Sequence, residues 1–141
     1  MDAIKEHNER YKFFQEITGE AMKVYNRYHP GLLESAYEAA LKYLLESKGF
    51  HVERQVYLPI YWDNVQLDQS YRIDLMVNDI IVELKAVQFI NADHRKQLWN
   101  YMNLTNTKHG MLINFGNKQG LLSEWYERDS VSSEISKIRL L

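Results

Sequence analysis

The sequence contains no cysteine, which excludes a disulfide framework and any catalysis by a thiol. It also has no apolar run near its N-terminus that resembles a signal peptide or a membrane span. Internal repeats and low-complexity linkers are missing as well. We therefore expect a cytoplasmic enzyme or binding module that has no membrane partner.

Charge of one sign is not in large excess either, because 17 basic and 19 acidic residues give a formal net charge of −2. A bulk electrostatic attraction to a polyanion is thus excluded, and any nucleic-acid site must be a local patch. What the sequence does have is 45% hydrophobic and 13% aromatic residues, which is typical of a globular protein. Its length suits one domain with a real core. We predict a single domain over residues 1–141.

Two amphipathic helices are predicted at the start. Residues 9–28 carry apolar side chains at spacings of three and four, and His29-Pro30-Gly31 ends this helix. A second apolar stripe predicts a helix over 32–48, with Gly49 as its stop.

The rest of the chain is mainly strand-like. We predict a strand over 50–62, a turn region over 63–70, two strands within 71–86, a helix over 92–106 and a buried strand over 110–115. Residues 117–134 have loop character with one possible strand, and 135–141 read as a C-terminal strand. The order α-α-β-β-β-α-β plus the C-terminal strand predicts an α/β fold with a mixed central sheet flanked by helices.

The segment YRIDLMVNDIIVELKA, residues 71–86, places three charges among apolar residues. A two-residue turn at Asn78-Asp79 makes it a hairpin, in which Asp74 lies opposite Glu83. Alternation then puts Asp74, Glu83 and Lys85 on one face, together with Met76 and Ile81. The other face is wholly aliphatic and should be buried under the first two helices; its members are Ile73, Leu75, Val77, Ile80, Val82 and Leu84.

The pairing of Asp74 with Glu83 is unfavourable unless something compensates it. Two ionised carboxylates about 5 Å apart repel by roughly 3 kcal/mol at an effective dielectric near 20. A divalent cation such as Mg²⁺ or Mn²⁺ would neutralise both, since hard oxygen ligands suit these ions. Lys85 alone, in an ordinary salt-bridged strand end, is the competing explanation. The hairpin does not decide between them.

These residues resemble the active-site hairpin of the PD-(D/E)XK nuclease superfamily, the restriction-endonuclease-like fold. Asp74, Glu83 and Lys85 have the superfamily form D-x(8)-E-x-K, and GLLESAY at 31–37 matches G-x-x-E-x-x-Y, the signature of the GxxExxY family within that superfamily. Three further blocks follow in the family's order, so that the resemblance covers roughly residues 25–116. Ser70 departs from the glycine expected there, and 117–136 is longer and more polar than the family pattern.

The resemblance implies a metal-dependent nuclease acting on nucleic acid, with DNA favoured. Asp74, Glu83 and the Leu84 carbonyl would hold Mg²⁺ or Mn²⁺, with Glu34 contributed by the preceding helix. Lys85 would be the motif lysine. Gln97 and Tyr101 resemble a Q-x(3)-Y element of exonuclease-like branches, and they share a helix face with His94.

Ordinary structural roles compete with several of these assignments. Glu34 could be a solvated helix residue, Tyr101 a core aromatic and His94 an exposed helix residue. His94, Arg95 and Lys96 form a small basic cluster that could meet a phosphate backbone, although such clusters are commonly solvated. For the whole chain, the alternatives are a binding module on the nuclease fold that does no efficient chemistry, or a metal-dependent enzyme with another substrate.

Overall fold

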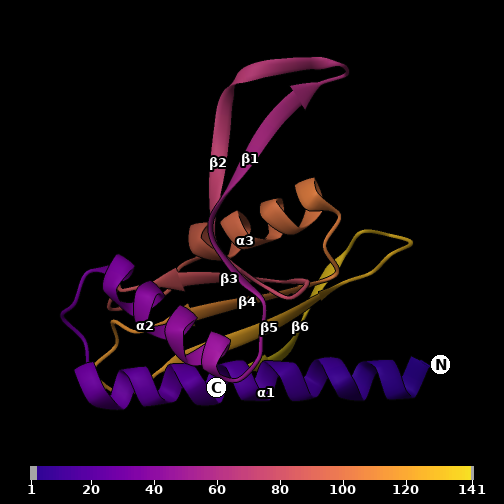
Figure 1. Cartoon of the computed structure of the whole chain (residues 1–141). Coiled ribbons are helices and arrows are strands. Elements are labelled where there is room, and N and C mark those ends of the chain that lie inside the picture. Colours follow the sequence, from indigo (N-terminus) through magenta and orange to yellow (C-terminus); the bar gives the residue numbers. More distant parts are fainter. Residues whose placement is uncertain (1–2, 141) are drawn as a thin grey trace.

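A computed structural model describes residues 3–140 as a six-stranded sheet with helices on both faces (Figure 1). The residues 1, 2 and 141 of the predicted single domain lie outside the described part. The elements are α1 (Ala3–Tyr28), α2 (Glu34–Ser47), β1 (Val52–Trp62), β2 (Val65–Val77), β3 (Ile80–Lys85), α3 (Ala92–Thr105), β4 (His109–Asn114), β5 (Leu122–Arg128) and β6 (Ile135–Leu140). No helix among residues 3–140 combines the length and apolar character needed to cross a bilayer.

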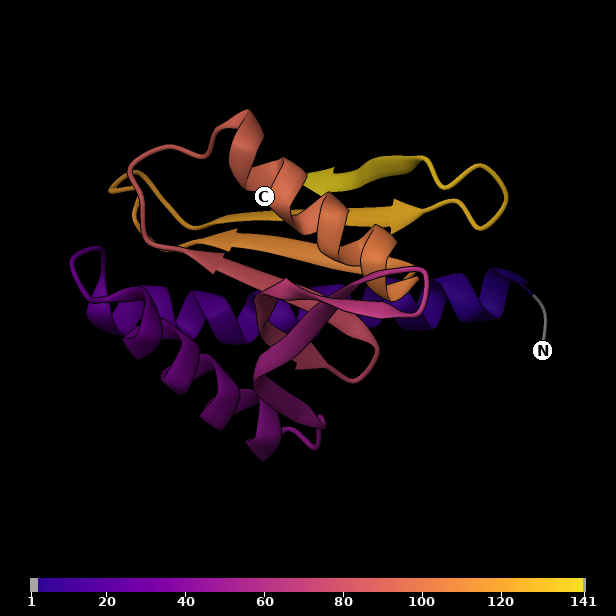
Figure 2. The ribbon, with the colours of Figure 1, turned by 90° about the horizontal axis from the view of Figure 1, so that it is seen from above.

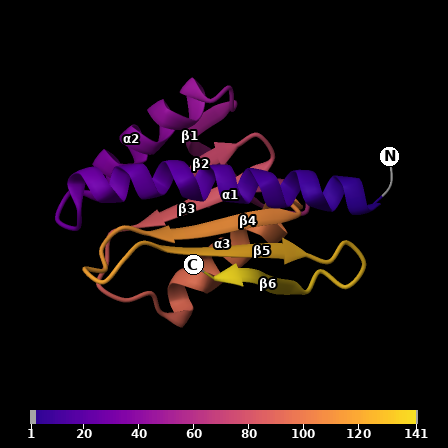
Figure 3. The same cartoon turned by 90° about the horizontal axis from the view of Figure 1, so that it is seen from below.

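The strands follow one another across the sheet in chain order, β1 to β6. Only β3 and β4 are parallel, because α3 connects them as a crossover; the other neighbours are antiparallel. Helices α1 and α2 cover one face, and α3 lies across the other (Figures 2 and 3). The mixed sheet flanked by helices that the sequence predicted is confirmed.

Each face of the sheet has its own apolar core. On one side the buried stripes of α1 and α2 pack on Leu75, Val77, Val82 and Leu84. On the other side α3 packs on Ile81, Leu112 and Tyr126 through its three buried residues, Leu98, Tyr101 and Met102. The helix approaches β4 closely at Gly110, where an added Cβ would lie 2.6 Å from the Met102 sulfur.

The predicted hairpin register is confirmed, since Leu75 pairs with Val82, Met76 with Ile81 and Val77 with Ile80. Its aliphatic face is buried as predicted, but Ile73 lies on the opposite side of the sheet, in the core beneath α3. The reason is a break in β1, where Gln55 has a φ of 54° and does not pair with Asp74. The strands turn at this point and carry Ile73 to the α3 side.

Residues 63–70, predicted as a turn region, are mostly strand. The turn is confined to Asp63 and Asn64, and β2 begins at Val65. The outer parts of β1 and β2 leave the sheet as a two-stranded arm (Figure 1). Every residue from 61 to 72 is exposed, so no burial pattern marked this strand in the sequence.

The polar C-terminal segment also contains more structure than its composition indicated. The one possible strand within 117–134 is β5, whose residues Ser123 to Tyr126 are buried. It lies between β4 and β6 and is therefore an interior strand of the sheet. The predicted strand over 135–141 corresponds to β6, and Leu141 lies outside the described residues.

Candidate active site

The carboxylates of Asp74 and Glu83 meet where β2 departs from β3. Leu75 and Val82 form the last pair of the β2–β3 ladder. The next residue on each strand, Asp74 on β2 and Glu83 on β3, is not paired with the other in this ladder. The Asp74 N–H donates to Glu83 Oε2 at 2.8 Å, and the Leu84 N–H donates to Asp74 Oδ2 at 2.9 Å. Each carboxylate thus accepts a hydrogen bond from the opposite strand, which holds both acids together at the divergence.

Both of these acids take up protons more readily than usual. Burial raises the pKa of Glu83 well above its ordinary value, and the charge of Asp74 adds to this effect. The pKa of Asp74 is also raised, again mainly by burial, despite the hydrogen bond from Leu84. Lys85 opposes both shifts but does not cancel them. The site therefore has an excess of negative charge that the surrounding protein does not neutralise.

Glu34 approaches this pair from the start of α2, of which it is the first residue. Burial raises its pKa, followed by the charge of Asp74, while Lys85 lowers it. These interactions place Glu34 in the electrostatic field of the hairpin acids. Glu34 is half-buried and is not the solvated helix residue that was one of the alternatives.

Lys85 is held by a chain of hydrogen bonds from α3. Its Nζ donates to Gln97 Oε1 at 2.7 Å, and Gln97 Nε2 donates to the Tyr101 hydroxyl at 3.1 Å. Tyr101 is buried in the core beneath α3, and its pKa is raised by burial and by the charge of Glu83. Tyr101 is thus a core aromatic, one of the alternatives that the sequence left open, and its hydroxyl bonds the residue that holds Lys85.

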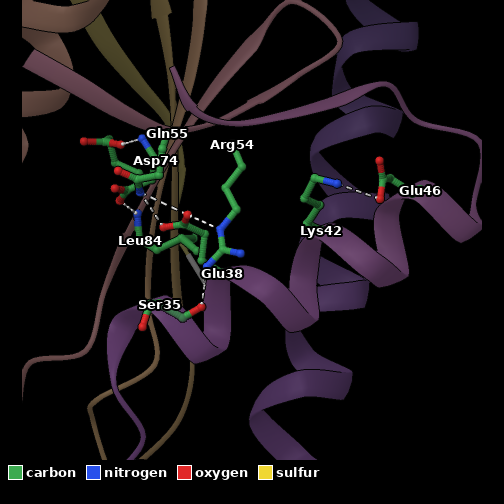
Figure 4. Close-up of polar contacts among 9 residues, drawn as sticks. Ser35, Glu38, Lys42, Glu46, Arg54, Gln55, Asp74 and Leu84 are labelled. Atoms are coloured by element: carbon green, nitrogen blue, oxygen red, sulfur yellow. Dashed lines mark hydrogen bonds and ion pairs between the residues drawn. The ribbon is translucent and has the colours of Figure 1, made fainter. Parts of the chain in front are cut away.

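Glu38 is a neighbour of the site that the sequence analysis missed. Its carboxylate is buried and accepts bonds from Arg54 Nε at 2.6 Å and from Gln55 Nε2 at 3.0 Å (Figure 4). The negative charge of Glu38 contributes to the raised pKa of Asp74. Its position one turn after Glu34 was the available signal, because residues i and i+4 share a helix face.

The basic cluster at the start of α3 is not a free phosphate-binding patch. Arg95 makes two bonds of 2.8 Å to the buried carboxylate of Glu124. His94 caps the helix together with Asn91: the Asn91 side chain accepts the His94 N–H, and His94 Nδ1 accepts the Asn91 N–H. Of the three residues in this cluster, Lys96 is exposed, and His94 and Arg95 are partly buried.

The donor set of the site suits a hard divalent cation. Among the side chains that the structure describes, no three acidic or histidine groups form a cluster that could enclose a metal ion by themselves. A Mg²⁺ ion does not require such a cage, since it is commonly held by one or two carboxylates and keeps several water ligands. Two carboxylates are available here, and burial raises both pKa values, with the charge of Asp74 adding to the shift at Glu83, an effect that a nearby cation would oppose.

The backbone N–H of Leu84 faces β2, the strand that carries Asp74. The Lys85 carbonyl accepts the Phe115 N–H, so the Lys85 peptide faces β4. Backbone groups alternate in direction along a strand, which turns those of Leu84 toward β2. Its N–H indeed bonds Asp74 there. We expect the Leu84 carbonyl to face the same side of the strand, since the N–H and C=O of one strand residue point the same way.

The chain belongs to the PD-(D/E)XK nuclease superfamily, whose family model matches residues 11–125. The mixed sheet with flanking helices is accordingly of the restriction-endonuclease-like type. Comparisons with curated proteins and with solved structures gave no match. The matched range includes the hairpin, Glu34, Gln97 and Tyr101.

Proposed function

We propose that this protein is a metal-dependent nuclease that hydrolyses phosphodiester bonds in nucleic acid, with DNA as the favoured substrate. The observation that carries this proposal is the meeting of Asp74 and Glu83 where β2 and β3 diverge, with Lys85 held beside them. Membership in a superfamily of nucleases supports it. The G-x-x-E-x-x-Y motif of residues 31–37 further supports placing the chain, as one domain, in the GxxExxY family.

Asp74, Glu83 and the Leu84 carbonyl are the groups that would hold Mg²⁺ or Mn²⁺, and Glu34 would contribute directly or through water. The chemistry that a cation held by these groups would supply is polarisation of the scissile phosphate and a lowered pKa of a water bound to it. Without it, the excess charge is relieved by proton uptake at Glu83 and Asp74, whose pKa values are raised.

Lys85 acts on the attacking water or on the negative charge that develops on the phosphate. Its ammonium group must be directed for either role, and the bond to Gln97 directs it. Tyr101 in turn fixes Gln97, and its ring is packed in the core beneath α3. The position of the lysine is therefore linked to a rigid part of the protein.

The direct test is a cleavage assay on single- and double-stranded DNA and RNA, with Mg²⁺, Mn²⁺ or EDTA. We expect cleavage with either metal ion and none in EDTA. A purified protein that binds these nucleic acids without cleaving any of them would contradict the proposal.

A further inference from the structure

The outer parts of β1 and β2 form an arm that projects from the body (Figure 1), and several of its aromatic side chains are exposed. Tyr57, Tyr61, Trp62 and Tyr71 are all exposed, Trp62 by 72% and Tyr71 by 42%. An exposed tryptophan near the tip of a hairpin contributes nothing to the core. The arm therefore has a role outside the folding of the body.

One of the rings, that of Tyr57, is held by two neighbours. Arg72 lies over the ring of Tyr57, with its guanidinium carbon 5.2 Å from the centroid, and Gln66 Nε2 donates to the Tyr57 hydroxyl at 3.1 Å. Tyr71 is the one aromatic residue of β2, whose Val65 and Leu67 are also exposed, by 63% and 39%. Exposed aromatic rings suit either a protein partner or the stacking of bases, and the contact of Tyr71 with Tyr101 beside the candidate active site favours the second use.

The arm leads directly into the candidate active site. The Tyr71 ring contacts the Tyr101 ring at a centroid distance of 5.6 Å, and Tyr101 bonds Gln97. Tyr71 precedes Asp74 by three residues on β2, which is about 10 Å along a strand. A strand of nucleic acid whose phosphate lies at Asp74 would thus have neighbouring bases within reach of Tyr71.

Charge on the arm is low. Within residues 57–72 Arg72 is the one basic residue, against Asp63 and Asp68. Attraction to phosphates is therefore not what the arm supplies, and its contribution to binding must come from the rings. The faces of bases are available for stacking in single strands, but inside a duplex they are covered by neighbouring bases.

We propose that the arm is a base-stacking surface that makes unpaired nucleic acid the preferred substrate of the nuclease. That unpaired nucleic acid is a substrate rests on the proposed nuclease function. That the arm binds it by stacking does not depend on cleavage. Tyr71 stacks a base next to the active site, and Trp62 extends the surface toward the tip. Sequence preference is weak, because stacking uses a feature that every base has.

The test measures the binding of one labelled oligonucleotide, single-stranded or annealed to its complement, by fluorescence anisotropy. The full chain carrying Glu83→Gln is used, in Mg²⁺ and in EDTA, so that the oligonucleotide stays intact. We expect tighter binding of the single strand. Adding Tyr71→Ala or Trp62→Ala should weaken single-strand binding by about five- to a hundredfold, with a smaller effect on the duplex.

Two controls separate stacking from other effects. Tyr71→Phe should retain the single-strand affinity, because the ring remains. Tyr43→Ala removes a tyrosine from α2 that is more exposed than Tyr71, 71% against 42%, and should change nothing. The slope of log affinity against log salt should be the same with and without the arm rings, since no phosphate contact is lost.

Equal single-strand affinities of the arm variants and their parent would overturn the proposal. A dimer of the wild type in sedimentation equilibrium that Trp62→Ala dissociates, without any change in nucleic-acid binding, would assign the arm to a second copy of the chain and also overturn it. Arm-dependent binding by a wild type that never cleaves would sink the proposed function and leave the stacking surface intact.

Discussion

Two buried glutamates lie in one row across the face of the sheet that α3 covers, and they behave in opposite ways. Glu83 on β3 pairs with Leu112 on β4, and Leu112 pairs with Glu124 on β5. The two carboxylates are thus two strands apart, about 10 Å. Their exposure is 2% and 0%. Yet the pKa of Glu83 is raised well above its ordinary value, whereas that of Glu124 is lowered.

The difference lies in the charges that surround each group. Glu124 accepts two bonds from Arg95, one from Lys137 at 3.3 Å and one from the Tyr126 hydroxyl. Glu83 has the carboxylate of Asp74 as its nearest charged partner, and Lys85 is shared with Gln97. Solvent exposure is nearly the same in both places, and burial raises both pKa values, but at Glu124 the bonds and charges of its partners outweigh it. The balance of charge makes Glu124 part of an ion pair, and at Glu83 it is consistent with the cation site proposed above.

The largest expected effect is on catalysis at Glu83. Glu83→Gln removes one metal-binding charge and preserves the shape, so cleavage should fall by orders of magnitude. Glu46→Gln is the matched control, because it makes the same substitution in an exposed ion pair with Lys42. The initial rates of nucleic-acid cleavage by the two variants, compared with wild type, test this prediction. Comparable activity of Glu83→Gln and wild type would remove Glu83 from the site.

The next effect is on stability, and it should have opposite signs at the two glutamates. Glu124→Gln leaves Arg95 and Lys137 without their charged partner, which should destabilise the protein by about 3 kcal/mol. Glu83→Gln in EDTA should be as stable as wild type or more stable, because it removes a repulsion. Urea unfolding of both variants measures these values. Equal losses at both positions would mean that both carboxylates are structural.

Gln97 should matter less than Glu83 and mainly for the rate of the chemical step. Gln97→Ala releases the Lys85 ammonium group from its 2.7 Å bond. Misdirection of a catalytic group lowers kcat by about ten- to a hundredfold, and KM should change little. Steady-state kinetics distinguish this from a binding role. A change confined to KM would show that Gln97 contacts the substrate instead.

The pH dependence of stability should also separate the two regions. Glu83 and Asp74 have folded-state pKa values above those of the unfolded chain. Between the unfolded and the folded values the folded protein binds more protons, so it loses stability as pH rises through this range. Glu124 has a lowered folded-state pKa, so its stabilisation is present above the unfolded value of about 4.3 and is lost as pH falls below it.

The advantage of Glu83→Gln over wild type in EDTA should therefore grow from acidic to neutral pH, by about 1.4 kcal/mol for each unit of pKa shift. The deficit of Glu124→Gln should shrink as the solution becomes acidic. Urea unfolding at a series of pH values measures both trends. A difference between Glu83→Gln and wild type that does not vary with pH would argue against the shared charge at Asp74 and Glu83.

The sequence predicted the secondary structure of buried segments better than that of exposed ones. The hairpin register followed from the alternation of residues 73–84 and the Asn78-Asp79 turn, and it is confirmed. The outer half of β2 was missed because both of its faces are exposed and polar residues interrupt it. Ile73 was assigned to the wrong face, since the positive φ of Gln55 is not encoded by any local pattern.

Among the candidate site residues, relations within one hairpin or one helix could be predicted from their spacing in the sequence. Contacts between different elements could not. D-x(8)-E-x-K and the helix face of Gln97 and Tyr101 could be read directly, because each lies within a hairpin or a helix. The clamp of Arg54 and Gln55 on Glu38 joins β1 to α2 and has no linear signature. Arg95 was interpreted as a surface charge for the same reason, as its partner Glu124 is 29 residues away.

The central claim is that the acids at the divergence of β2 and β3 form a cation site, and thermal unfolding in Mg²⁺ and in EDTA tests it most directly. Mg²⁺ at ten times its Kd adds about 1.4 kcal/mol to the stability of the folded state, which corresponds to a rise in Tm of a few degrees. We predict this rise for wild type and for Glu46→Gln, and a much smaller one for Glu83→Gln. A wild-type Tm that does not respond to Mg²⁺, together with a Glu83→Gln variant that is destabilised in EDTA, would contradict the claim.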